Sequence, residues 1–188
     1  MFSLNIISNG LWNFIFLTNT KIGFVLSLVD VIFMLYSCCY MMMKSTRAKV
    51  STCEWIVMRC GFTIYAAWVS AATILNVAYM LKAFDFADPD IPVDEETMTV
   101  IILWVALVIY NVATYLERNP LFGGVFIWVI LAIHHNIVNN KSELEKIENN
   151  SVLIGMIHCI SMFGFTTYLA IEYFSDYKVD NWYFGLFY

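Results

Sequence analysis

Long apolar runs separated by short polar segments dominate the hydrophobic pattern of this chain. Five of these runs are long enough to cross a bilayer, at residues 22–43, 55–81, 98–116, 121–138 and 152–174. A spanning helix needs about 20 largely apolar residues, because backbone groups find no water in hydrocarbon and a helix pairs its own. The pattern therefore predicts an all-α integral membrane protein, a bundle of five to six transmembrane helices forming a single membrane domain over residues 1–188.

The N-terminal run, residues 2–18, is apolar but carries the polar or small residues Ser3, Asn5, Ser8, Asn9, Gly10 and Asn13. Two interpretations are open for this run. It is either a short sixth span shielded by its neighbours or a helix lying in the membrane interface. A cleaved signal peptide is not expected, because the basic N-terminal region and the small-residue cleavage site are both missing.

Composition agrees with the membrane class and gives a weak indication of orientation. The chain is 61% hydrophobic and 13% charged, whereas soluble domains are typically about 25% charged. If all six runs cross, one face carries Lys44, Arg47, Lys49, Arg118 and Lys178, and the other carries Lys21, Lys82, Lys141 and Lys146. The positive-inside rule then places both termini on the cytoplasmic or matrix side.

Three ionisable residues lie inside the predicted spans and are candidates for intramembrane polar or partner contacts. A charge there costs about 2.5 to 3.5 kcal/mol even on lenient insertion scales, so Asp30, Arg59 and His158 each need a partner or water. We expect Asp30 and Arg59 to lie more than about 10 Å apart, with Arg59 snorkelling to its own interface. Asp30 is protonated, hydrogen-bonded within the protein, paired with another subunit, or part of a proton relay. His158 is either hydrogen-bonded between helices or a haem or metal ligand, and no metal site is predicted.

The segment YAAWVSAATILN, residues 65–76, keeps polar-tipped side chains within an apolar run. At 3.6 residues per turn, one helix face collects Tyr65, Trp68, Ala72, Asn76 and Tyr79. A seam of alanines beside this face allows a neighbouring helix to approach closely. The face therefore lines a ligand pocket or packs against another helix, and periodicity alone favours packing.

The same segment resembles the last helix of the translocator proteins, or tryptophan-rich sensory proteins, whose pattern there is Y-x-x-W-x-(T/S)-A-A-T-x-L-N. Upstream, NGLWNFIF at 9–16 resembles the third family helix, N-x-L-W-x-x-x-F, and residues 22–43 fall where the fourth belongs. The resemblance covers residues 9–82. Residues 122–133 are similar to the longer bacterial and algal relatives, so 98–174 would form three additional transmembrane helices, followed by an aromatic acidic tail at 175–188.

This resemblance implies a pocket for a tetrapyrrole or sterol-like ligand. By position in the motifs, Trp12 belongs to the wall from the third family helix, and Trp68, Ala72 and Asn76 to the wall from the last. The family's first two helices have no counterpart here, so about half of the expected wall is missing. Three downstream helices, a second copy or another protein are the candidates for enclosing the other side.

Two functions therefore compete, and an enzyme is not expected because no catalytic motif appears. We favour an accessory or structural subunit of a larger membrane complex, plausibly respiratory and in the mitochondrial inner membrane, because the pocket is truncated and the tail is aromatic. The alternative is a membrane protein that binds or transports a tetrapyrrole or sterol-like ligand. No cofactor is predicted beyond bound lipid, and the expected partners are the bilayer and other membrane subunits, without nucleic acid.

Overall fold

The computed structural model describes residues 1–46, 52–84, 94–139 and 145–176, and these ranges fold into helices. In chain order the elements are α1 (Phe2–Leu17), α2 (Lys21–Thr46), α3 (Thr52–Trp55), η1 (Ile56–Cys60), α4 (Gly61–Ala83), α5 (Glu95–Glu117), α6 (Pro120–Asn139) and α7 (Glu145–Asp176). No strand occurs in the described ranges, and five helices are long and apolar enough to span a membrane: α2, α4, α5, α6 and α7. The predicted all-α membrane class is confirmed.

Local sequence signals account for how the helices begin and end. Asp94 is the N-cap of α5, and its side chain accepts a hydrogen bond from the Thr97 backbone N–H at 3.2 Å. Arg118 ends α5 in the left-handed conformation, with φ 49°, and Pro120 opens α6, where its missing N–H costs nothing. α1 and α2 are separated by a three-residue turn in which Asn19 also has a positive φ of 50°.

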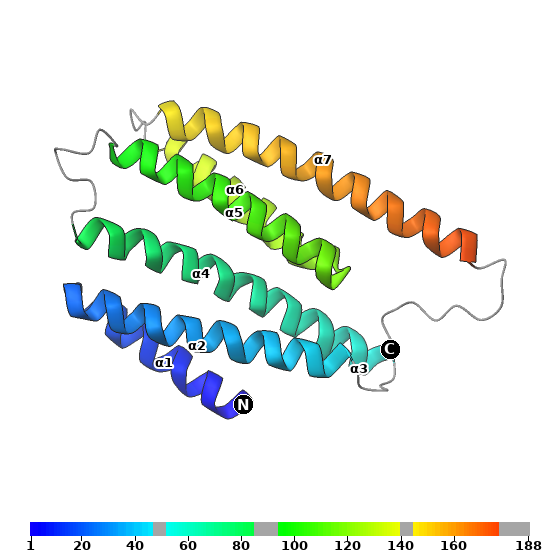
Figure 1. Cartoon of the computed structure of the whole chain (residues 1–188), viewed down its shortest axis with the longest axis horizontal. Coiled ribbons are helices and arrows are strands. Elements are labelled where there is room, and N and C mark those ends of the chain that lie inside the picture. Colours follow the sequence, from blue (N-terminus) through cyan, green and yellow to red (C-terminus); the bar gives the residue numbers. More distant parts are fainter. Residues whose placement is uncertain (47–51, 85–93, 140–144, 177–188) are drawn as a thin grey trace.

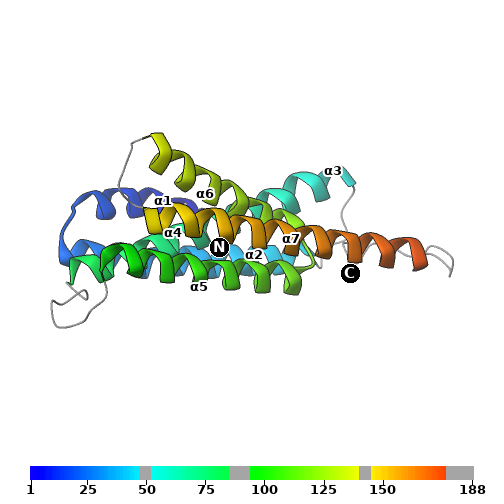
Figure 2. The same ribbon diagram turned by 90° about the horizontal axis from the view of Figure 1, so that it is seen from above.

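The helices form an incomplete two-layer bundle. α2, α4, α5 and α7 lie side by side in one layer (Figure 1), and α1 and α6 lie on the same side of it (Figure 2). α1 packs on α2, whereas α6 packs on α4, α5 and α7. α4 therefore lies between the part of the bundle that carries α1 and the part that carries α6.

Two spans differ in detail from the prediction. The run at 55–81 is not one regular α-helix, because a π-helical segment, η1, precedes α4. π-helical turns widen the backbone locally and are frequent near functional sites. α7 begins at Glu145 rather than near 152, and its 32 residues make it about 48 Å long at ~1.5 Å per residue.

The outer surface of the bundle is apolar, and polar side chains are buried inside it together with an apolar core. Buried polar side chains include Asn5, Ser27 and Asn76, each at most 1% exposed, whereas Phe14 and Phe163 are 76% and 75% exposed. In lipid, hydrogen bonds between buried polar groups hold helices together, and apolar side chains face the acyl chains. This distribution agrees with a membrane-embedded bundle.

Candidate functional site

A cavity of about 600 Å³ follows one face of α4, and we call it the α4 groove. α4 forms its floor with Trp68, Ala71, Ala72 and Leu75. α1 and α2 contribute one wall, and α5 and α6 contribute the other. The groove therefore lies where the two parts of the bundle meet, a common place for a small-molecule site.

The alanines of α4 create much of this space. Ala71, Ala72 and Ala78 line the groove and carry only a methyl group, so no large side chain of α4 fills the space above them. The lining runs along α4 from Tyr65 to Ala78, a length of about 20 Å at ~1.5 Å per residue. The space suits an elongated molecule.

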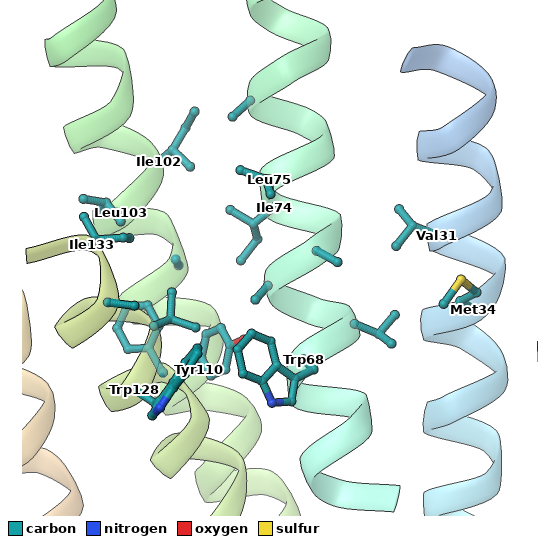
Figure 3. Close-up of a pocket in the computed structure, with 18 of the residues that line it drawn as sticks. Val31, Met34, Trp68, Ile74, Leu75, Ile102, Leu103, Tyr110, Trp128 and Ile133 are labelled. Carbon is teal, nitrogen blue, oxygen red and sulfur yellow. The ribbon is translucent and has the colours of Figure 1, made fainter. Parts of the chain in front are cut away.

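Aromatic rings gather at one end of the α4 groove (Figure 3). Trp68 of α4 meets Trp128 of α6 edge to face, with ring centroids 4.9 Å apart. Tyr110 of α5 stacks on Phe126 at 4.7 Å, and its hydroxyl donates to the Ala67 carbonyl of α4 at 2.5 Å. These contacts join α4 to α5 and α6 and give the groove a flat aromatic end.

Few polar groups of the groove have free hydrogen-bonding capacity. Asn9 donates to the Tyr65 hydroxyl at 3.1 Å, and that hydroxyl donates to Asn5 Oδ1 at 2.7 Å, so these groups are satisfied within the protein. The indole N–H groups of Trp68 and Trp128 have no hydrogen-bond partner in the described part of the chain. None of the described lining side chains is charged. The groove thus offers apolar surface and two indole donors.

Four of the residues predicted for a ligand site line the α4 groove together: Trp12, Tyr65, Trp68 and Ala72. Trp12 reaches it from α1, and the other three belong to α4. Trp12 and Tyr65 also make hydrogen bonds, so they shape the wall as well as covering it.

The other two predicted residues, Asn76 and Tyr79, lie outside the lining. Asn76 is fully buried, and its Oδ1 accepts hydrogen bonds from Ser27 Oγ at 2.8 Å and Trp12 Nε1 at 3.4 Å. Tyr79 packs against Phe16 and Phe24, with ring centroids 5.2 and 5.9 Å away. Both side chains therefore hold α1 and α2 against α4.

Residue patterns alone did not identify the second wall. α5 and α6 supply Leu103, Ala106, Tyr110, Val129 and Ile133, among others. Of the three candidates for enclosing the far side, the downstream helices supply this wall, through α5 and α6 and without α7. The aromatic residues of α5 and α6 were visible in the sequence. Their spacing, however, does not show which face of each helix turns toward α4.

The three intramembrane ionisable residues lie away from the groove lining. Asp30 accepts a hydrogen bond from Ser8, and its second oxygen is buried without a hydrogen-bond partner among the described residues. His158 is fully buried between α7 and α6, with Nε2 3.0 Å from the Gly123 carbonyl oxygen. These contacts agree with the hydrogen-bonded alternatives for both residues.

Arg59 differs from the expectation of a side chain extended toward the interface. It is only 4% exposed and lies in η1. Glu117, at the end of α5, interacts with it electrostatically. A nearby carboxylate offsets part of the cost of burying a guanidinium, so Arg59 remains inside the protein.

Comparison with known proteins adds one result. A family model described as TSPO-like protein matches residues 1–168 of the chain. The match covers α1 to α6 and most of α7, and so includes both walls of the α4 groove. No curated protein and no solved structure matches the chain. The absence of the family's first two helices, expected from the motifs, stays a prediction.

Proposed function

The chain belongs to the TSPO-like protein family, and on this premise we propose that it binds an elongated, largely apolar small molecule in the α4 groove. The proposal concerns binding within the membrane and assigns no catalytic step. The observation that carries it is the apolar cavity of about 600 Å³ between helices from both parts of the bundle. Small-molecule sites are typically about 300 to 1,000 Å³, concave and mostly apolar, with few polar groups.

Between the two ligand classes that the family resemblance implies, the lining favours a sterol-like molecule. A tetrapyrrole with ionised carboxylates needs cationic or multiple neutral donors, because an unpaired charge in an apolar site is costly. The described lining has no cationic side chain. The indole N–H groups of Trp68 and Trp128, which have no partner among the described residues, suit a hydroxyl or a carbonyl oxygen. A lipid acyl chain is the competing apolar occupant.

Tryptophan fluorescence tests this proposal directly, because Trp12, Trp68 and Trp128 line the groove. Titration of the detergent-purified protein with a fluorescent sterol should quench tryptophan emission by energy transfer. Trp68→Phe and Trp128→Phe should each reduce the quenching. Trp104→Phe is the matched control, because Trp104 lies outside the lining and bonds to Asn150 at 3.1 Å. Equal quenching in all three variants would refute binding in the groove.

A substitution that fills the groove provides a second test, which leaves all of the tryptophans in place. Ala72→Leu places a larger side chain on the floor and should weaken sterol binding at least about tenfold, since it removes space that the ligand needs. Ala170→Leu, on the exposed face of α7, is the control. Protoporphyrin titrated in parallel distinguishes the ligand classes: tighter binding of protoporphyrin than of sterol would contradict the sterol assignment.

The second candidate function is an accessory subunit of a larger membrane complex, plausibly respiratory and in the mitochondrial inner membrane. The sequence of the tail supports it, because 175–188 is aromatic and acidic, which suits a partner groove or a headgroup interface. Most of this tail, residues 177–188, lies outside the described residues. Native gel electrophoresis of mildly solubilised membranes should then show the chain in a large assembly, and deletion of residues 180–188 should release it. A small homogeneous species, or fractionation with another membrane, would contradict this assignment.

A further inference from the structure

The outward face of α1 is apolar along its whole length. Leu4, Ile7, Leu11, Phe14 and Leu17 are between 52% and 77% exposed. They recur at helical spacing from the first turn to the last and form an apolar stripe, beside which Ser3 and Asn13 are the exposed polar side chains of α1. Its apolar character continues on the exposed side of α2, the helix on which α1 packs.

The inward face of α1 is polar, and its groups are hydrogen-bonded to α2 and α4. Asn5 is 1% exposed and donates to the Met34 carbonyl of α2 at 3.1 Å. Ser8 is 5% exposed and bonds to Asp30 of α2. Asn9, one position further along, reaches the hydroxyl of Tyr65 on α4. Three of the polar residues that interrupt this apolar segment, Asn5, Ser8 and Asn9, therefore point into the protein, whereas Ser3 and Asn13 are exposed.

This polarity is opposite to that of an interfacial helix. Such a helix turns a polar, charged face to water and buries its apolar face in the headgroup region. α1 contains no acidic or basic residue, and its inward-facing polar side chains, Asn5, Ser8 and Asn9, already have protein partners. We propose that α1 is a sixth membrane-embedded helix whose outer face contacts lipid acyl chains. The chain then crosses the bilayer six times, and both of its ends lie on the same side.

The register of α1 against α2 shows that α1 is long enough for this role. α2 begins at Lys21, and the contact between Asn5 and Met34 lies 13 residues further along. At ~1.5 Å per residue this level is about 20 Å from Lys21, and Met1 lies one turn, or about 6 Å, beyond. α1 thus reaches about 26 Å into a hydrocarbon core of about 30 Å. Local thinning or tilt closes a mismatch of this size.

Topology mapping of the full chain tests the proposal. Different epitope tags on the two termini, probed by protease in sealed vesicles and again after permeabilisation, show on which side each terminus lies. Six crossings predict that both tags are protected, or both cleaved, in the same vesicles. Tags with opposite protection would mean an odd number of crossings and would overturn the proposal.

A matched pair of substitutions tests lipid contact independently. By the same register Ile7 lies near the middle of the bilayer, whereas Leu17 lies beside the turn into α2, and both are exposed, at 59% and 77%. Ile7→Lys should lower the yield of folded, membrane-inserted protein about tenfold or more, because the cost of a lysine rises steeply toward the membrane centre. Leu17→Lys should have little effect, because its ammonium reaches the interface. Equal yields from the two variants would contradict an embedded α1.

Discussion

Replacing Asn76 with alanine tests whether this side chain holds helices together or contacts a ligand. Its amide bonds α4 to Ser27 of α2 and to Trp12 of α1, and its Nδ2 donates to the Ala72 carbonyl at 2.8 Å. It is fully buried and lies outside the lining of the α4 groove. Alanine removes both interhelical hydrogen bonds and leaves a small void. We therefore expect a loss of stability with little direct effect on the ligand site.

The size of the loss follows from these contacts. An interhelical hydrogen bond in a membrane protein contributes about 0.6 kcal/mol on average and up to about 1.7 kcal/mol. The 2.8 Å bond to Ser27 should be the stronger of the two, because the bond to Trp12 is 3.4 Å long. The void and the unpaired Trp12 indole add to the cost. Together these effects should destabilise the protein by about 1 to 3 kcal/mol.

Thermal unfolding of the detergent-purified protein measures this loss. For a chain of this size 1 kcal/mol shifts Tm by about 2–4 °C, so Asn76→Ala should melt several degrees lower than the parent protein. The control is Asn13→Ala, because Asn13 is exposed and bonds only to the Asn9 carbonyl within α1. If Asn76→Ala melts like the control but loses ligand affinity, Asn76 acts in binding and the structural assignment is wrong.

Two further substitutions test contacts at the groove and at the membrane surface. Tyr110→Phe removes the hydroxyl of α5 that bonds to the Ala67 carbonyl of α4. It should lower Tm by a few degrees and weaken ligand binding in fluorescence titrations. An unchanged Tm would refute a stabilising bond. Hydrogen bonding from the Thr97 side chain, followed by that from Lys146, holds the pKa of Asp94 below its usual range. The stability from this carboxylate is therefore present at neutral pH and is lost as the pH falls through that lowered pKa. The Tm of Asp94→Ala should therefore lie below that of the parent protein at pH 7, and this difference in Tm should disappear below about pH 4. A difference in Tm that does not depend on pH would contradict a role for the charge.

The five long spans were predictable because their signal is local. An apolar run of sufficient length has one favourable state in a bilayer, whatever it packs against. Pro120 at the start of α6 and the acidic residues at the start of α5 are equally local signals, because helix termini depend on neighbouring residues. η1 was not predicted, since its π-helical turns leave no distinct pattern in the apolar run.

The candidate site was only partly predictable. The motif at 65–76 correctly brought Trp68 and Ala72 to one face of a helix, but it grouped Asn76 with them. A face about 100° wide contains residues that meet different neighbours, and Asn76 turns toward α1 and α2 rather than into the groove. Helical periodicity gives the direction of a side chain but does not identify what lies there.

The sequence by itself determined that this is a helical membrane protein, where its long spans lie and which family it resembles, because hydrophobic length and short motifs are properties of contiguous residues. Only the tertiary structure decided that α5 and α6 complete the wall opposite α1 and α2, that Arg59 is buried, and that Asn5, Ser8 and Asn9 of α1 face inward. Each of these depends on which helix faces meet. Lipid and protein interiors are both apolar, so hydrophobicity alone does not distinguish the face of a helix that packs from the face that contacts lipid.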